Sequence, residues 1–442
     1  MSLVSGGWLD DSRNRAAVAV GGCAATAVVL VVLTTLAGNL VLSVLLAGLG
    51  LGIIIMLTQG YEWTTHLVML GGMVFAPMNS VRVTGFVTIA DLLFVLGFAL
   101  LTPTVLRRHL HVSVLFLVGW LVMLVVGLTA SLAAPETAIS FNHMTRLVVA
   151  GLMLPLAFML WRPSQRMLVR LATAYLMGAT FSCLYGATLG AGDGGDRLLG
   201  LTTHPNFLGL TAVLATALVP YVVAYTKQQW RWCIWLAGLV CVYGVWFSGS
   251  RAAFVALAAL VIVYTVRESS VLMGLGMAAA GTVLLLFLDK VGQGGEGNAL
   301  SRILGGGSAA GSDLQREQLF EVAMERFGNH PIIGNGFEHA MEAHSVYLQV
   351  AVSIGVIGVA GYLVMFLAMT LPMLDTSRAN YRLAYPALTY ALVGIFTNSL
   401  WDRFVWAVLA LSMAGVVADN YQRGGAMHHP RERLTEPAEG AR

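Results

Sequence analysis

Charged residues are scarce in this chain. They make up 11% of its 442 residues, and hydrophobic residues make up 57%, whereas a soluble domain has about 25% charged residues. This composition excludes a soluble globular domain and an intrinsically disordered chain. The apolar residues also form continuous runs of about 20 instead of alternating with polar ones, which excludes an outer-membrane β-barrel. The sequence therefore predicts a polytopic α-helical membrane protein.

Lysine and cysteine are scarce as well. The only lysines are Lys227 and Lys290, and the 25 basic and 22 acidic residues nearly balance. No basic patch of the kind that binds nucleic acid is present. The four cysteines all lie inside apolar runs, so we interpret them as small buried or lipid-facing residues and not as a disulfide set or a metal cluster. No small-residue cleavage site follows the first apolar run, which is therefore predicted to be a retained helix.

Fourteen apolar stretches approach the length that a helix needs to cross a bilayer. They cover residues 16–36, 39–58, 63–78, 86–105, 112–134, 145–161, 167–190, 205–225, 230–247, 252–266, 270–288, 345–374, 383–398 and 403–419. Because 63–78 and 252–266 are short, we expect an all-α fold with about 12–14 transmembrane helices. Residues 1–421 would form one transmembrane domain, and 422–442 would form a polar, disordered cytoplasmic tail.

The basic residues of the short loops predict the orientation of these spans. With a cytoplasmic N-terminus, the basic loops fall mostly on the cytoplasmic side. Single arginines remain on the outer side: Arg82, Arg146, Arg197, Arg251 and Arg403. An outer arginine more often binds lipid phosphate or snorkels than takes part in catalysis. Each of these arginines nevertheless breaks the bias and needs an explanation of its own.

The predicted extracytoplasmic loop at 289–344 has two parts. Residues 292–311 contain eight glycines and are predicted to be mobile. Ser312-Asp313-Leu314-Gln315 then matches a capping box, and Phe320, Ala323, Met324 and Phe327 follow at helical spacing. Gly328 and Pro331 would end this helix. The pattern predicts a short amphipathic helix that lies on the membrane surface or over a cavity, or that only packs the loop down.

Polar residues concentrate at the outer ends of spans and in the outer loops. A transporter would instead be expected to place ionisable groups near the middle of the membrane. Four stretches contain most of these residues: Arg197 to His204-Pro205-Asn206, Ser248-Gly249-Ser250-Arg251, Asn329-His330-Pro331-Ile332-Ile333-Gly334-Asn335-Gly336, and His344-Ser345-Val346-Tyr347. A histidine at a helix start is more often a cap or an interfacial residue than a catalytic one. Two arginines on the same face as His344 are nevertheless suited to a diphosphate, because the guanidinium fork stays charged and binds oxygens bidentately.

The fourth stretch carries a specific resemblance. His344-Ser345, nine further residues and then Gly355-Val356-Ile357-Gly358 match the H-[N/S/Q]-x9-G-x-x-[G/T/Y] signature of the O-antigen ligase family. The other three stretches are similar to segments of that family in the same chain order, so the resemblance covers about 190–420 with motifs. Thr88-Ile-Ala-Asp91 is similar to an early family segment.

The resemblance implies a fold like that of the C-type membrane glycosyltransferases. It also implies a metal-independent enzyme of the O-antigen ligase and polymerase superfamily, which uses no nucleotide sugar or other cofactor. Such an enzyme transfers a glycan from a polyprenyl diphosphate to a lipid- or glycan-linked acceptor at the outer face of the bacterial cytoplasmic membrane. His344 would be the base, and Arg197 and Arg251 would bind the diphosphate. Glu338 or Glu342 would orient His344 or contact sugars, although neither matches a family position.

Several alternatives remain open from the sequence. His204 and Asn206 are substrate-binding candidates, but ordering of the Arg197 loop is the favoured role for His204. Glu338, His339, Glu342 and His344 are poorly spaced for a metal site on one helical face. A polymerase, in which donor and acceptor are both carrier-linked, fits the same residues as a ligase. A lipid-linked glycan flippase or transporter is the alternative from another class, and a channel or structural protein would leave the arginines and His344 unexplained.

Overall fold

The computed structural model describes residues 61–85, 87–106, 111–189, 197–268, 275, 298–303, 309–339 and 343–428. The predicted spans at 16–36, 39–58 and 270–288 lie outside these residues, apart from residue 275, and so does most of the glycine-rich stretch. The described chain is α-helical, and its only β contact is an isolated bridge between Arg82 and Thr88. The chain divides into two compact units, Met1–Gly72 with Arg82–Leu106 and Met73–Val81 with Arg107–Arg442.

Eight helices of the described residues are long and apolar enough to cross a membrane. They are Ile89–Leu106, Val114–Ala133, Thr137–Trp161, Gln165–Leu189, Pro205–Tyr225, Gln228–Phe247, Val346–Leu374 and Arg403–Tyr421. The predicted all-α, multi-pass membrane fold is therefore confirmed. The short predicted spans at 63–78 and 252–266 are also helices, α3 (Tyr61–Phe75) and α11 (Arg251–Arg267).

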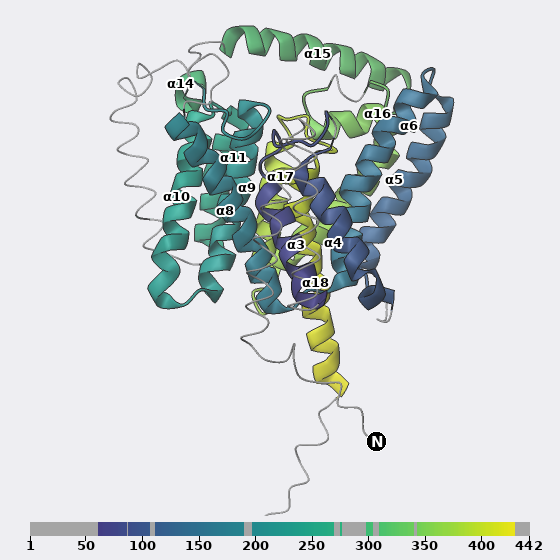
Figure 1. The fold of residues 1–442 in the computed structure, drawn as a ribbon. Helices are drawn as coiled ribbons and strands as arrows, with labels where there is room; N and C mark the ends of the chain where they lie inside the picture. Colours follow the sequence, from purple (N-terminus) through teal and green to yellow (C-terminus); the bar gives the residue numbers. More distant parts are fainter. Residues whose placement is uncertain are drawn as a thin grey trace, which may run out of the picture. The chain divides into compact units, whose positions relative to one another are not determined.

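Figure 1 gives the course of the chain. The remaining helices are α4 (Ile89–Leu106), α5 (Val114–Ala133), α6 (Thr137–Leu147), α7 (Leu154–Trp161), α8 (Gln165–Leu189), α9 (Pro205–Tyr225), α10 (Arg231–Phe247), α14 (Ala299–Ile303), α15 (Ala309–Asn329), α16 (Val346–Thr370), α17 (Tyr385–Val393) and α18 (Arg403–His428). Short 3₁₀ helices lie at Gln228–Trp230, Leu371–Leu374 and Tyr381–Ala384, and a π-helical turn at Val148–Met153 joins α6 to α7.

Three predicted boundaries are wrong. The span expected at 383–398 is the nine-residue helix α17, which at 1.5 Å per residue is far shorter than a bilayer. The span expected at 145–161 begins at Thr137, so Arg146 lies inside a helix and not in an outer loop. The polar sequence of α6 hid this extension, because only its α7 half is strongly apolar. The tail expected from residue 422 begins as helix, since α18 continues to His428.

In the first unit, the start of α4 explains the early segment Thr88 to Asp91. The Asp91 carboxylate accepts a 2.8 Å hydrogen bond from the Thr88 backbone N–H, and the Thr88 hydroxyl accepts a 3.2 Å bond from the Asp91 N–H. This reciprocal pair satisfies two N–H groups at the start of the helix. Asp91 therefore has a structural role at a helix start.

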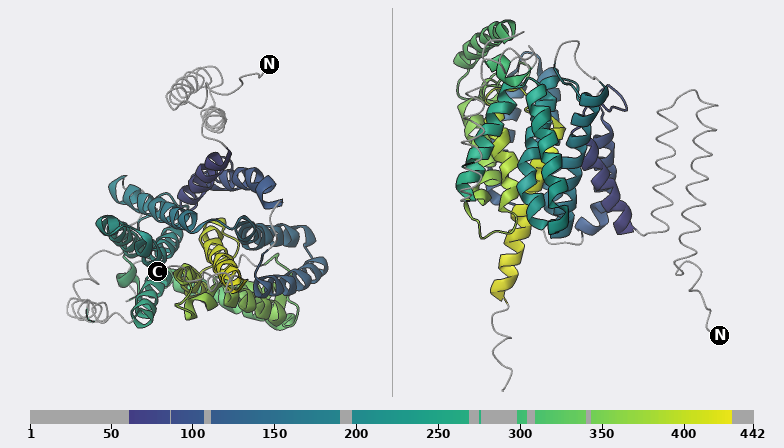
Figure 2. Two further views of the ribbon diagram at one scale, coloured as in Figure 1. Left: turned by 90° about the horizontal axis from the view of Figure 1, so that it is seen from below. Right: turned by 90° about the vertical axis from the view of Figure 1, so that its left-hand side faces the viewer.

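In the second unit, α18 lies at the centre and contacts α7, α8, α9, α16 and α17. Its membrane-spanning window is 83% buried inside the protein, the largest share of the eight helices (Figure 2). The closest helix pair is α5 with α16. A Cβ on Gly119 would lie 2.6 Å from the Gly361 carbonyl oxygen, so only glycine allows these backbones to approach so closely.

Helix α15 crosses one end of the second unit, from the side of α11 and α14 to that of α16 (Figure 1). The C-terminal part of α18 projects at the opposite end (Figures 1 and 2). The predicted helix is therefore present, but of its predicted apolar face Phe320 and Met324 are exposed and Ala323 is buried. The helix begins at Ala309, before the predicted capping box, so Ser312–Gln315 lies inside the helix and does not start it.

Candidate functional site

The first two candidate stretches contact each other at the end of the second unit that α15 covers. The Arg197 guanidinium donates to the Ser248 carbonyl at 2.9 Å and to the Asn206 side-chain oxygen at 2.7 Å. The His204 ring nitrogen Nδ1 accepts the Asn206 backbone N–H at 3.1 Å, and His204 is the N-cap of α9. His204 thus caps the start of α9, and Asn206 holds Arg197.

The turn Ser248-Gly249-Ser250-Arg251 begins α11. Gly249 adopts a φ of 64°, and the Ser250 hydroxyl accepts the Ala253 N–H at 3.4 Å as the N-cap. This turn places Arg251 at the first position of the helix. The buried Arg302 of α14 donates to the Gly249 carbonyl at 2.8 Å. Arg197, Arg251 and Arg302, which are far apart in sequence, therefore lie around one turn.

Helix α15 supplies an acid to this group of arginines. The two guanidinium nitrogens of Arg251 donate to the two carboxylate oxygens of Asp313, one of them at 2.8 Å. The pKa of Asp313 is lowered, mainly by these hydrogen bonds and further by the charges of Arg316 and Arg302. The carboxylate therefore stays ionised at neutral pH. Its side chain is nevertheless 51% exposed, so solvent reaches the pair.

His344 lies within electrostatic range of Arg316, which follows Asp313 by three residues on α15. Burial and then the charge of Arg316 lower the pKa of His344 from its usual value of 6.5. Burial, followed by the charge of Arg251, also lowers the pKa of Arg316, while Asp313 raises it. Arg316 therefore lies within electrostatic range of both Arg251 and His344. Both Arg316 and His344 are half-buried, and within the described residues neither side chain makes a hydrogen bond or an ion pair.

The third stretch and the glycines after His344 form one structural unit. Helix α16 breaks at Ile354 and Gly355, where Gly355 has a φ of 60°. The segment Pro331–Gly336 pairs with the freed backbone groups. The N–H groups of Asn335 and Gly336 donate to the carbonyls of Val352 and Ser353 at 2.8 and 3.0 Å, and the Val356 N–H donates to the Pro331 carbonyl at 2.9 Å. Since unpaired backbone groups are costly inside a membrane protein, this segment makes the break possible.

The break explains why glycine is needed in the signature. A Cβ on Gly355 would lie 2.2 Å from the Ile332 carbonyl oxygen, in a conformation that side chains rarely adopt. A Cβ on Gly358 would meet Ile354 at 2.0 Å. Ser345 is the N-cap of α16, and the neighbouring Val346 N–H donates to the Gly394 carbonyl at 2.8 Å. His344 is thus held directly before a helix whose start and break are both fixed by backbone hydrogen bonds.

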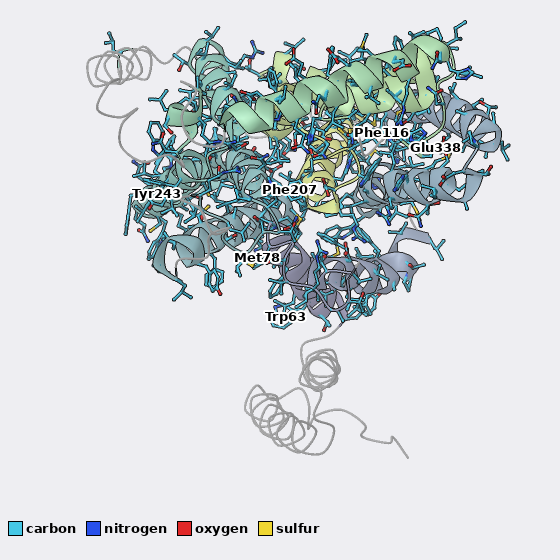
Figure 3. The ribbon with its side chains drawn as sticks, turned by 90° about the horizontal axis from the view of Figure 1, so that it is seen from above. Trp63, Met78, Phe116, Phe207, Tyr243 and Glu338 are labelled. Carbon is cyan, nitrogen blue, oxygen red and sulfur yellow. The ribbon has the colours of Figure 1, made fainter. Side chains whose placement is uncertain are left out.

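The C-terminal half of α15 is anchored to this unit. Ala323 is buried against Ala343 and Val352, with Phe327 packed beside them. The Asn335 side-chain amide donates to the Arg326 carbonyl at 2.9 Å. Helix α15 therefore reaches from an ionic contact at Arg251 to an apolar contact at α16, and Figure 3 looks down on the end of the molecule that it crosses.

The remaining sequence candidates lie elsewhere. One carboxylate oxygen of Glu338 accepts the Glu136 backbone N–H at 2.7 Å, and the other lies 3.0 Å from the His339 ring nitrogen. Glu338 thus ties its loop to the start of α6, and within the described residues it makes no hydrogen bond or ion pair with His344 or the arginine group. Glu342 lies outside the described residues. Arg82 donates to the Gly85 carbonyl at 2.8 Å, which closes its own turn.

Sequence reasoning missed Arg302, Asp313 as a partner of Arg251, and Arg316. A signal for two of them was present. Continued backwards, the spacing of Phe327, Ala323 and Phe320 gives Arg316 and then Asp313 at steps of four and three. One face of α15 thus carries Asp313 and Arg316 near its start and the packed Ala323 and Phe327 further along, whereas Phe320 between them is exposed.

Two further features bear on ligands. Among the residues that the structure describes, no group of three or more His, Cys, Asp or Glu side chains is placed to hold a metal ion. An apolar cavity of about 210 Å³ lies between α9, α10 and α11, lined by residues that include Val219, Trp235, Leu257, Val261 and Tyr264. Helix α11 therefore carries Arg251 at its first residue and lines an apolar cavity further along.

No protein-family model matches the chain, and a search of curated proteins finds no similar sequence. Function is therefore inferred from the residues and their geometry.

Proposed function

We propose that the protein is a membrane glycosyltransferase of the O-antigen ligase type. It transfers a glycan from a polyprenyl-diphosphate carrier to a lipid- or glycan-linked acceptor at the outer face of a bacterial cytoplasmic membrane. The observation that carries the proposal is the position of His344. His344 is half-buried directly before α16, makes no hydrogen bond within the described residues and lies within electrostatic range of Arg316, which is in turn within electrostatic range of Arg251.

This arrangement suits a group transfer with a base and an anionic leaving group. The lowered pKa of His344 keeps its imidazole neutral at pH 7, so a ring nitrogen has a lone pair available for a proton. In the proposed step, His344 takes the proton of the acceptor hydroxyl as its oxygen bonds to the anomeric carbon. The bond from that carbon to the diphosphate oxygen breaks, and its electron pair leaves on the diphosphate.

The arginines act on the leaving group. Arg251 offers a bidentate guanidinium, and charge-assisted contacts of this kind stabilise the negative charge that develops on the diphosphate. Arg197 is held at the same turn by Ser248 and Asn206, and its guanidinium would add a second positive charge on the side of the leaving group. The apolar cavity along α11 matches the chemistry of a prenyl chain attached to that diphosphate. A polymerase would use the same residues with a carrier-linked acceptor.

The test is a transfer assay in lipid vesicles. The purified protein receives an undecaprenyl-diphosphate-linked oligosaccharide and a panel of acceptors, and product is measured for the parent and for His344→Ala. We expect His344→Ala to lower the rate by about 10²–10⁴-fold, the range for loss of a general base. His330→Ala is the matched control, because His330 is an exposed histidine of the same loop.

Unchanged transfer by His344→Ala, with His330→Ala also unchanged, contradicts the mechanism. Movement of labelled carrier across the vesicle membrane without any glycan transfer contradicts the proposed function and favours a flippase.

A further inference from the structure

Arg316 is a cation in an unusual position. Its guanidinium is half-buried and lies on the same face of α15 as Asp313, three residues earlier, which binds Arg251, and within the described part of the chain it makes no hydrogen bond. Removing a guanidinium from water without an acceptor is unfavourable, and a second positive charge nearby adds to the cost. An anion that reaches both guanidinium groups would offset this cost.

Asp313 occupies part of this site. Its carboxylate binds both nitrogens of the Arg251 fork, which is the geometry that a phosphate group uses on arginine. A carboxylate carries one negative charge, whereas a diphosphate carries more charge and more acceptor oxygens. A diphosphate therefore has the chemistry to bind Arg251 and Arg316 together, whereas Asp313 hydrogen-bonds only Arg251.

The two ends of α15 are held by contacts of different strength, so moving one end away from the protein is less unfavourable than moving the other. The Asp313 end is held by an ion pair whose carboxylate is 51% exposed. The other end is held by Ala323, which is 3% exposed, and by the hydrogen bond from Asn335 to the Arg326 carbonyl. A competing anion can break the first contact without disturbing the second.

From these contacts we propose that Arg316 is a third diphosphate-binding residue, and that Asp313 is a resident anion which the diphosphate of the donor displaces from Arg251. The inference rests on the proposed function, because it takes a polyprenyl diphosphate as the ligand. When the ligand binds, Arg316 contacts the diphosphate and Asp313 leaves Arg251. The end of α15 at Ala323 stays in place.

The first test measures binding without an acceptor, so it does not depend on glycan transfer. The full-length protein in detergent is titrated with undecaprenyl diphosphate, with inorganic pyrophosphate and with undecaprenol. We expect Arg316→Gln to weaken binding of undecaprenyl diphosphate by about tenfold or more, since a charge-assisted contact is lost. We expect Asp313→Asn to tighten it several-fold, because the competing charge is gone. Glu317→Gln, which removes an exposed acid of the same helix, is the matched control and stays at the parent value.

An unchanged affinity in Arg316→Gln, or an unchanged or weaker affinity in Asp313→Asn, overturns the proposal. If the variants change the affinity for inorganic pyrophosphate and for undecaprenyl diphosphate alike, the phosphate groups are what the protein recognises. That result supports the proposal. If the variants change the affinity for inorganic pyrophosphate but not for undecaprenyl diphosphate, the ligand is not lipid-linked and the proposal is contradicted. Equal binding of undecaprenol and undecaprenyl diphosphate also overturns the proposal.

The second test measures displacement by hydrogen–deuterium exchange. Undecaprenyl diphosphate should raise amide exchange in residues 309–317 and leave residues 323–329 unchanged. Equal exchange at both ends of α15 with and without the ligand overturns the displacement of Asp313. If these binding results hold and no acceptor is ever glycosylated, the proposed transfer reaction fails while the diphosphate site stands.

Discussion

Each end of α11 contributes one partner to an arginine–carboxylate pair, and the two pairs differ in their surroundings. At the start, Arg251 pairs with Asp313, whose side chain is 51% exposed and receives no other hydrogen bond within the described residues. At the end, Glu268 pairs with Arg382 at 2.6 Å, and their side chains are only 15% and 25% exposed. The hydroxyls of Tyr381 and Tyr385 also donate to Glu268, at 2.6 and 3.2 Å.

The difference indicates that a ligand anion can replace Asp313 on Arg251, whereas none can replace Glu268 on Arg382. Glu268 has its oxygens filled by three donor side chains of one short segment, so it joins α11 to the segment that begins α17. Asp313 faces an excess of positive charge, because Arg251, Arg302 and Arg316 all act on it. The pair at Glu268 is thus expected to stabilise the fold, and the pair at Arg251 to bind a ligand.

The largest expected effect is on transfer at the Arg251 end. Arg251→Gln should lower the transfer rate by about 10²–10³-fold, the usual loss when one preorganised donor to a developing charge is removed. The thermal stability should stay close to that of the parent, since the pair is solvent-exposed. The measurement is the vesicle transfer rate together with thermal unfolding in detergent. An Arg251→Gln protein with a lower unfolding temperature and a normal transfer rate would contradict this prediction, because the Arg251 pair would then stabilise the fold and not bind the ligand.

At the other end, Arg382→Gln should destabilise the protein. It leaves Glu268 with two tyrosine donors and no positive partner, which costs about 1–3 kcal/mol for a partly buried charge. The midpoint of thermal unfolding should therefore fall, while transfer per folded molecule stays near the parent value at low temperature. Arg166→Gln, which removes an exposed arginine of α8, controls for the change in net charge. An Arg382→Gln protein with normal stability and no transfer would show that this pair is not structural.

The smallest effect concerns pH. His344 must be neutral to take a proton, and Arg316 helps to lower its pKa below the usual 6.5. The transfer rate of the parent should therefore be retained above that value and fall as the pH drops through the lowered pKa. Arg316→Gln removes a positive neighbour, so the pKa of His344 rises and the rate begins to fall at a higher pH. Normalised pH–rate profiles measure this shift, and a profile that does not move, or moves to lower pH, shows that Arg316 does not act on His344.

The membrane fold was predictable because long apolar runs leave few alternatives to transmembrane helices. The predictions failed where polarity and helical structure diverge. Thr137 to Arg146 is polar but helical, and the apolar stretch at 383–398 is helical only from Tyr385 to Val393, followed by turns. The apolar composition of a stretch indicates whether it lies in lipid, but it does not indicate at which residue the helical backbone hydrogen bonds end.

The candidate site was predictable only where a residue type carries a chemical expectation. Arg197, Arg251 and His344 stood out because charged residues are scarce in the whole chain and because the two arginines broke the predicted charge bias of the loops. Arg302 and Arg316 did not, since they lie in a region whose polar and glycine-rich sequence makes an arginine ordinary. Whether a guanidinium has an acceptor depends on tertiary contacts between α15, α11 and α16, and spacing along the chain does not contain that information.

The break in α16 has a consequence for how the protein is made. The segment Pro331–Gly336 forms hydrogen bonds with the backbone groups that the break in α16 leaves unpaired. It precedes α16 in the chain and therefore leaves the ribosome first. The unpaired carbonyls of Val352 and Ser353 thus find their donors already synthesised when the nascent helix enters the bilayer. Lengthening the connection between residue 339 and His344 should slow the pairing of these backbone groups, and we expect the effect on membrane insertion during biogenesis and not on the folded protein.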